Sequence, residues 1–139
     1  MIEFQLDKAD ITLDPASYFP WVKYVIKEEN HHPGDIFYHF CSDKFLLKLN
    51  RDFLQHDYLT DIITFPFSTR PEIISGEIFI SIDRVRENAS ALQTDFEREF
   101  ARVLIHGVLH LLGYNDHTGE EKRVMRSKED YYLSLLPQK

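Results

Sequence analysis

Residues 106–117 read HGVLHLLGYNDH, and this stretch governs how the rest of the chain is interpreted. His106 and His110 are four residues apart, which places both imidazoles on one face of an α-helix and allows them to bind one metal ion. Gly113 is suited to end that helix in a left-handed conformation, and the turn can bring His117 back toward the pair. Three imidazoles with a fourth position left for water are typical of a catalytic zinc site.

The alternative is that these histidines are ordinary core or surface residues, because the chain has 7 histidines and one pair at this spacing can arise by chance. The helical pair, the glycine stop and the third histidine together favour a metal site. Gly107 stands where the zinc-protease motif H-E-x-x-H has its general base, which argues against a protease. Gly107 either leaves room for substrate or backbone beside the metal, or serves helix packing.

The same stretch resembles the signature H-G-x-L-H-L-x-G-Y-D-H of the YbeY family, the metal-dependent endoribonucleases of ribosomal RNA maturation. Asn115 lengthens the step from His110 to His117 by one residue relative to that signature, and a turn can absorb one residue. The metal ligands that the resemblance implies are therefore His106, His110 and His117.

A second resemblance to this family runs from Leu49 to Phe67, where the family pattern is L-N-x-x-Y-R-x-K-D-x-P-T-D-V-L-S-F-P-F. This chain has Leu54 where the family commonly has arginine, and His56 where it has lysine. The positive charge that the segment offers near the metal is thus absent or reduced. His56 either supplies a proton or partial charge near neutral pH, or is a solvated loop residue.

The resemblance implies a zinc-dependent endoribonuclease that hydrolyses phosphodiesters with a metal-bound water and acts in ribosomal RNA maturation and ribosome quality control. We expect one zinc ion, although nickel or copper would also bind three imidazoles in vitro. Two alternatives stay open: a non-catalytic ribosome-assembly factor with a structural metal, and a metallohydrolase of another substrate class. The residues single out no general acid or base.

Length and composition predict a single domain over residues 1–139 that buries a sizeable core, since 43% of the residues are apolar. The one cysteine, Cys41, cannot form an intramolecular disulfide and suits a reducing cytoplasm. The N-terminus lacks the pattern of a signal peptide, and no apolar run is long enough to span a membrane.

The net charge of −7 disfavours direct binding of nucleic acid, unless positive charge is local or a partner holds the RNA. The family resemblance implies ribosomal RNA, and the ribosome or a ribosomal protein, as partners. Arg98 and Arg102 are the best basic candidates, because steps of four residues place them on the helix face of His106. Pairing of these arginines with Glu97 or Glu99 is the alternative.

Periodicity predicts an α+β domain in which a small mixed four-stranded sheet is packed with about five helices. The metal site is expected on the long helix and the turn after it. The predicted strands are 2–6, 36–41, 62–65 and 76–81, and residues 30–34 and 68–75 are predicted as turn and loop. The predicted helices begin at Asp14-Pro15 or Pro20, at Lys44, at Asp83, and at capping boxes led by Thr94 and Thr118.

Two carboxylates near the predicted metal site have alternative roles. Glu77 either orients a ligand histidine from behind or is a solvent-facing strand residue. Asp116 either fixes the tautomer of a histidine by accepting its second N–H, or caps the turn.

Overall fold

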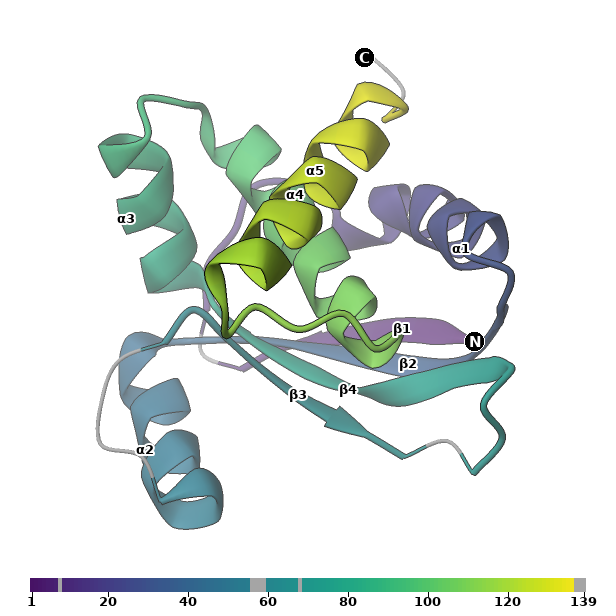
Figure 1. The fold of residues 1–139 in the computed structure, drawn as a ribbon. Helices are drawn as coiled ribbons and strands as arrows, with labels where there is room; N and C mark the ends of the chain where they lie inside the picture. The colour runs from purple at the N-terminus through teal and green to yellow at the C-terminus, as the bar shows by residue number, and fades with distance from the viewer. Residues whose placement is uncertain (8, 56–59, 68, 137–139) are drawn as a thin grey trace.

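A mixed β-sheet forms one layer of the protein. The computed structural model describes residues 1–7, 9–55, 60–67 and 69–136. The strands are β1 (Ile2–Leu6), β2 (His32–Cys41), β3 (Ile62–Pro66) and β4 (Ile73–Ser81), in the order β1-β2-β4-β3 (Figure 1). β1, β2 and β4 run parallel and β3 pairs antiparallel with β4, so the predicted mixed four-stranded sheet is confirmed.

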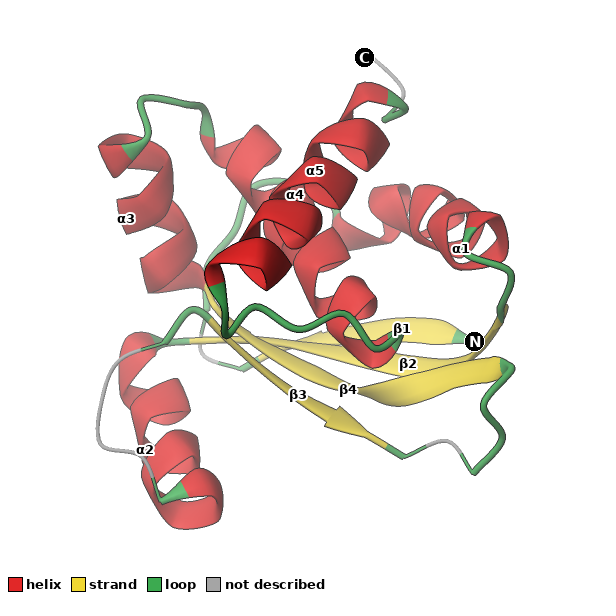
Figure 2. Cartoon of the chain, viewed as in Figure 1, coloured by secondary structure: helices red, strands yellow, loops and turns green. Residues whose placement is uncertain are grey.

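Helices pack on this sheet, and most of them lie on one of its faces (Figure 2). A 3₁₀ turn precedes five α-helices: Pro15–Tyr18, then α1 (Phe19–Glu28), α2 (Asp43–Leu54), α3 (Ile82–Ala91), α4 (Phe96–Leu111) and α5 (Gly119–Ser134). α4 packs against the sheet and also against α1, α3 and α5. The α+β class with five helices is therefore confirmed.

The core lies between the sheet and α4. Tyr38 and Phe40, two residues apart on β2, lie on the face of the sheet that meets the helices, and both are fully buried. Phe100, Leu104 and Val108, at steps of four on α4, meet them in one apolar cluster. α4 is therefore enclosed over most of its surface, and the face that carries its two histidines is held in a fixed orientation.

Two strands begin earlier than predicted. β2 begins at His32 and β4 at Ile73, within segments predicted as turn and loop. The two extensions pair with each other across a register shift between Pro33 and Ile36. A Cβ on Gly34 would lie only 2.2 Å from Oγ of Ser75. This pairing is a tertiary contact at a close crossing, so local turn propensity predicted the wrong structure there.

The helix starts are close to the predicted ones. The N-cap of α4 is Asp95, not Thr94, and its carboxylate accepts a hydrogen bond from the Arg98 amide at 2.7 Å. A carboxylate also interacts favourably with the positive end of the helix dipole, which explains why it displaces the threonine. The capping box of Thr118 and Glu121 that starts α5 is confirmed. No helix in the described part of the chain is both long and apolar enough to cross a membrane.

Candidate metal centre

The end of α4 positions the candidate site. Gly113 has a φ of +106°, and its amide donates to the carbonyl of His110 at 3.0 Å. The Tyr114 amide donates to the carbonyl of Leu109 at 3.0 Å, which completes a Schellman-type end to the helix. The glycine stop predicted from the sequence is therefore confirmed, and it turns the chain back along the histidine face.

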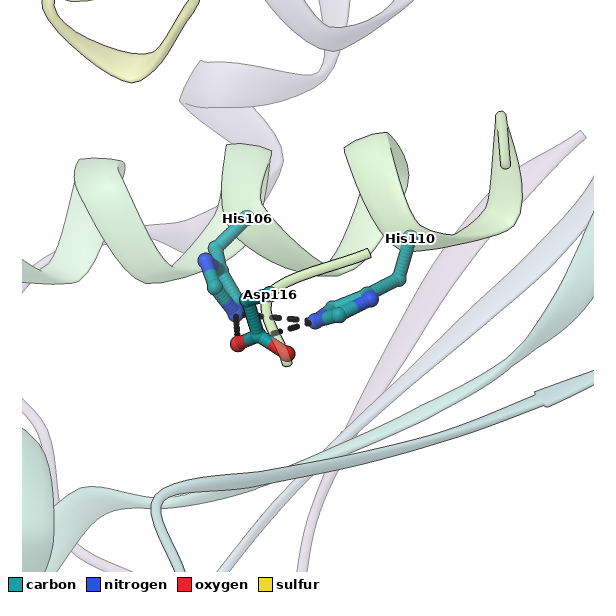
Figure 3. Close-up of side chains that lie close together, drawn as sticks. All are labelled: His106, His110 and Asp116. Atoms are coloured by element: carbon teal, nitrogen blue, oxygen red, sulfur yellow. Dashed lines mark hydrogen bonds and ion pairs between the residues drawn. The ribbon is translucent and has the colours of Figure 1, made fainter. Parts of the chain in front are cut away.

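Three side chains converge beside this turn (Figure 3). Nε2 of His106 and Nε2 of His110 are 3.0 Å apart. Oδ2 of Asp116 lies 3.4 Å from the first nitrogen and 3.6 Å from the second. Among the residues that the structure describes, these three form the one group whose donor atoms all lie close enough together to hold a metal ion.

These spacings fit a small divalent cation. Ligand bonds of 2.0–2.1 Å in tetrahedral geometry place neighbouring donor atoms about 3.3 Å apart. The three distances of 3.0, 3.4 and 3.6 Å cluster around that value. Two nitrogens and one carboxylate oxygen are also donors that zinc accepts, and three protein ligands leave a fourth position open.

The third member of this group is Asp116 rather than the predicted ligand His117. His117 is exposed, and its amide donates to Oε1 of Glu121 at 3.1 Å, within the start of α5. Asp116 is the tenth residue after His106, the place where the YbeY signature has its third histidine. Counting ten residues from His106 identifies Asp116, whereas matching the residue type identifies His117. The role of His117 as a metal ligand stays a prediction.

Glu129 on α5 contacts His106 on the side of the ring away from the converging donors, and it was not identified from the sequence. Its Oε2 lies 2.6 Å from Nδ1 of His106, and the residue is only 2% exposed. A carboxylate at Nδ1 holds the proton there, which leaves the Nε2 lone pair facing the cluster. Burial raises the pKa of Glu129, but His106 and Arg102 lower it by more, so the carboxyl stays ionised.

Arg102 belongs to this support, because it pairs with Glu129 and with Glu99. Its guanidinium donates to Oε1 of Glu129 at 3.0 Å and to Oε1 of Glu99 at 2.8 Å. Both carboxylates are almost fully buried. The alternative that Arg102 pairs with Glu99 is therefore confirmed, and a guanidinium between two buried acids is committed to them. Arg98, the other candidate, is exposed.

The electrostatic environment keeps His110 neutral. Burial lowers its pKa most, and the neighbouring His106 lowers it further. Asp116 and a hydrogen bond with the backbone of Tyr114 act in the opposite direction without reversing the shift. A neutral imidazole is the form that binds metal.

Two further predictions are settled by packing. A Cβ on Gly107 would lie 2.9 Å from side-chain atoms of both Ile62 and Ile78, so this glycine serves close packing of α4 on the sheet. It does not leave room for substrate. Glu77 lies beside His39, with Oε1 3.7 Å from its Nε2, and orients neither histidine of the candidate centre.

The segment with the second family resemblance is only partly described. Leu54 ends α2 with 40% of its surface exposed, so this position offers an apolar side chain to solvent. His56 lies outside the described residues.

Comparison with known proteins connects this architecture to one family. The sequence model of the family described as "Endoribonuclease YbeY" matches residues 2–137. The Endoribonuclease YbeY of Flavobacterium psychrophilum is 47% identical over 98% of this chain and 96% of its own length. That of Cytophaga hutchinsonii is 52% identical over 83% of this chain and 80% of its own length. The solution structure of a Thermotoga maritima protein is similar with a TM-score of 0.70 and 27% identity, covering 96% of this chain and 87% of that one.

The fold and the three converging donors define an α+β protein with a candidate metal centre at the end of its central helix. The chain belongs to the YbeY family of endoribonucleases.

Proposed function

We propose that this chain is a zinc-dependent endoribonuclease of ribosomal RNA maturation. The observation that carries the proposal is the convergence of His106, His110 and Asp116 in a chain of the YbeY family. Oxygen and nitrogen donors at these spacings suit a first-row divalent ion, and nickel or copper would compete with zinc in vitro.

The residues of the chain would divide the work at this centre. His106, His110 and Asp116 would hold the ion, which when bound acts as a Lewis acid on a phosphodiester and lowers the pKa of water. Glu129 keeps the proton of His106 on Nδ1, at 2.6 Å from its own Oε2. Because Asp116 supplies a carboxylate in place of a third imidazole, the ligand set carries one negative charge, which weakens the Lewis acidity of the ion.

The charge of the molecule supports a partner that presents the RNA. The net charge is −7, and several arginines are already paired with acids. Arg84 contacts Asp43 at 3.0 Å, and Arg102 lies between two buried glutamates. We infer that the cytoplasmic ribosome, or a ribosomal protein on it, supplies much of the positive charge that RNA requires.

The test begins with the metal. Untagged protein is analysed by mass spectrometry for metal content, beside Asp116→Ala and His117→Ala. We expect about one zinc per chain in the wild type and in His117→Ala, and none in Asp116→Ala. Loss of zinc from His117→Ala with retention by Asp116→Ala would overturn the ligand assignment.

The reaction is tested next with the zinc-loaded protein. Ribosomal RNA, free and within ribosomes, is incubated with wild type and with His110→Ala, and new ends are mapped. We expect cleavage that needs His110 and that is stronger within ribosomes. Zinc-loaded protein that leaves both substrates intact would contradict catalysis and favour an assembly factor with a structural metal.

A further inference from the structure

One partly buried carboxylate outside the candidate centre connects three distant segments. Glu29 caps the C-terminal end of α1, and its side chain is 10% exposed. Its Oε1 accepts the hydroxyl of Tyr114 at 2.6 Å, and its Oε2 accepts Nζ of Lys128 at 3.0 Å. The hydroxyl of Tyr132 also donates to Oε2. The turn after α4 and the body of α5 are thereby fastened to the end of α1.

The position of Glu29 is unfavourable apart from these contacts. A negative charge at a helix C-terminus lies against the negative end of the helix dipole, and burial removes its water. Burial raises the pKa of the Glu29 carboxyl, but donors from Tyr114, Tyr132 and Lys128 lower it by more. The ionised carboxylate is therefore stable where it is because of its three partners.

One of those partners, Tyr114, belongs to the turn of the metal centre. It follows Gly113, lies two residues before Asp116, and binds α4 through its amide. Tyr114 is therefore held by its hydroxyl to Glu29 and by its amide to the carbonyl of Leu109 at the end of α4.

We propose that Glu29 is a positioning residue of the metal centre: by holding the Tyr114 hydroxyl, it fixes the turn that carries Asp116. This inference rests on the proposed function in one respect, that the centre binds a metal. Glu29 itself touches none of the three donor groups, so it acts through the residues that it holds, of which Tyr114 lies in the turn of the centre.

The first test measures zinc affinity by competition with a chromophoric chelator, using full-length protein. We expect Glu29→Gln and Tyr114→Phe to bind zinc roughly tenfold more weakly than wild type, as for loss of a group that orients ligands. The double variant should be no weaker than Glu29→Gln alone, because the contact that Tyr114→Phe removes is one that Glu29 makes.

The matched control is Tyr38→Phe. Its hydroxyl donates to the carbonyl of Leu104 in α4 at 3.0 Å, so the variant also loses one buried hydrogen bond of a tyrosine. We expect a lower melting temperature with unchanged zinc affinity. If Tyr38→Phe weakens zinc binding as much as Tyr114→Phe does, or if Glu29→Gln binds zinc like the wild type, the positioning role is overturned.

A second readout needs no metal. Amide hydrogen exchange of residues 114–118 is measured in metal-free protein, and we expect faster exchange in Glu29→Gln and Tyr114→Phe than in wild type. Unchanged exchange there would also overturn the proposal. A wild type that binds no zinc would defeat the proposed function, and the exchange result would still decide whether Glu29 holds the turn.

Discussion

Within the described residues, two clusters of histidine and carboxylate lie on opposite faces of the sheet. On the helix-covered face, His106 and His110 meet Asp116 at the end of α4. On the other face, His39 of β2 lies with Nδ1 3.2 Å from Asp7 and Nε2 3.7 Å from Glu77. Residue types alone would make these clusters look alike.

The difference between them is convergence. At His39 the two carboxylates lie at opposite nitrogens of a single ring, so no common point exists for an ion. That ring is also stacked on Phe79 with centroids 4.2 Å apart and contacts Phe37 at 4.6 Å. At α4, two rings on one helix aim the same atom, Nε2, at one carboxylate oxygen. The helix and its glycine stop therefore bring donor atoms to one point, whereas the carboxylates around His39 pack at separate atoms of one ring.

The sharpest way to break this comparison is to remove one histidine from each face. We expect His110→Ala to reduce zinc from about one per chain to nearly none, since two remaining donors bind weakly. His39→Gln should keep its zinc, because its ring takes no part in the centre. The zinc content of both purified variants is measured by mass spectrometry. Loss of zinc from His39→Gln would mean that metal binding on the helix face depends on the His39 cluster.

The next largest effect separates buried from exposed ion pairs. Arg102→Met leaves Glu99 and Glu129 buried without their cation, and we expect it to destabilise the fold by about 3–5 kcal/mol. Within the described residues, Arg123 pairs with exposed Glu120, so Arg123→Met should unfold at the wild-type urea concentration. The free energy of unfolding of both variants is measured by urea denaturation. A wild-type midpoint for Arg102→Met would show that the buried network contributes little.

A smaller effect compares the carboxylates behind each histidine. Glu129→Gln leaves a neutral partner for Nδ1 of His106, and we expect zinc affinity to fall by about 10–100-fold. Glu77→Gln is the matched control on the other sheet face, where we expect no change. The zinc affinity of each variant is measured by competition titration. Equal zinc affinities for Glu129→Gln and Glu77→Gln would show that Glu129 does not support metal binding.

Sequence patterns predicted most of the fold and two of the three converging donors. Alternation identified the four strands, and cap residues placed the helix starts within a few residues, because both signals are local. Asp116 was missed as a donor because one added residue, Asn115, changes which side chain the turn aims inward. Glu129 was missed because it lies 23 residues from His106 and only the packing of α5 on α4 brings them together.

The smallest predicted effect concerns acid stability and Glu29. Its folded pKa is lowered, so the carboxylate contributes stability that is fully present above the ordinary value of 4.5 and is lost as pH falls through the folded pKa. Glu29→Gln cannot titrate, so its melting temperature should fall less steeply than that of wild type below pH 4.5. Tyr38→Phe, which loses a hydrogen bond but no charge, should melt lower at every pH with the wild-type slope. Parallel curves for wild type and Glu29→Gln in thermal scans across this range would mean that the three donors around Glu29 do not stabilise its charge, and the turn of the metal centre would then need another anchor.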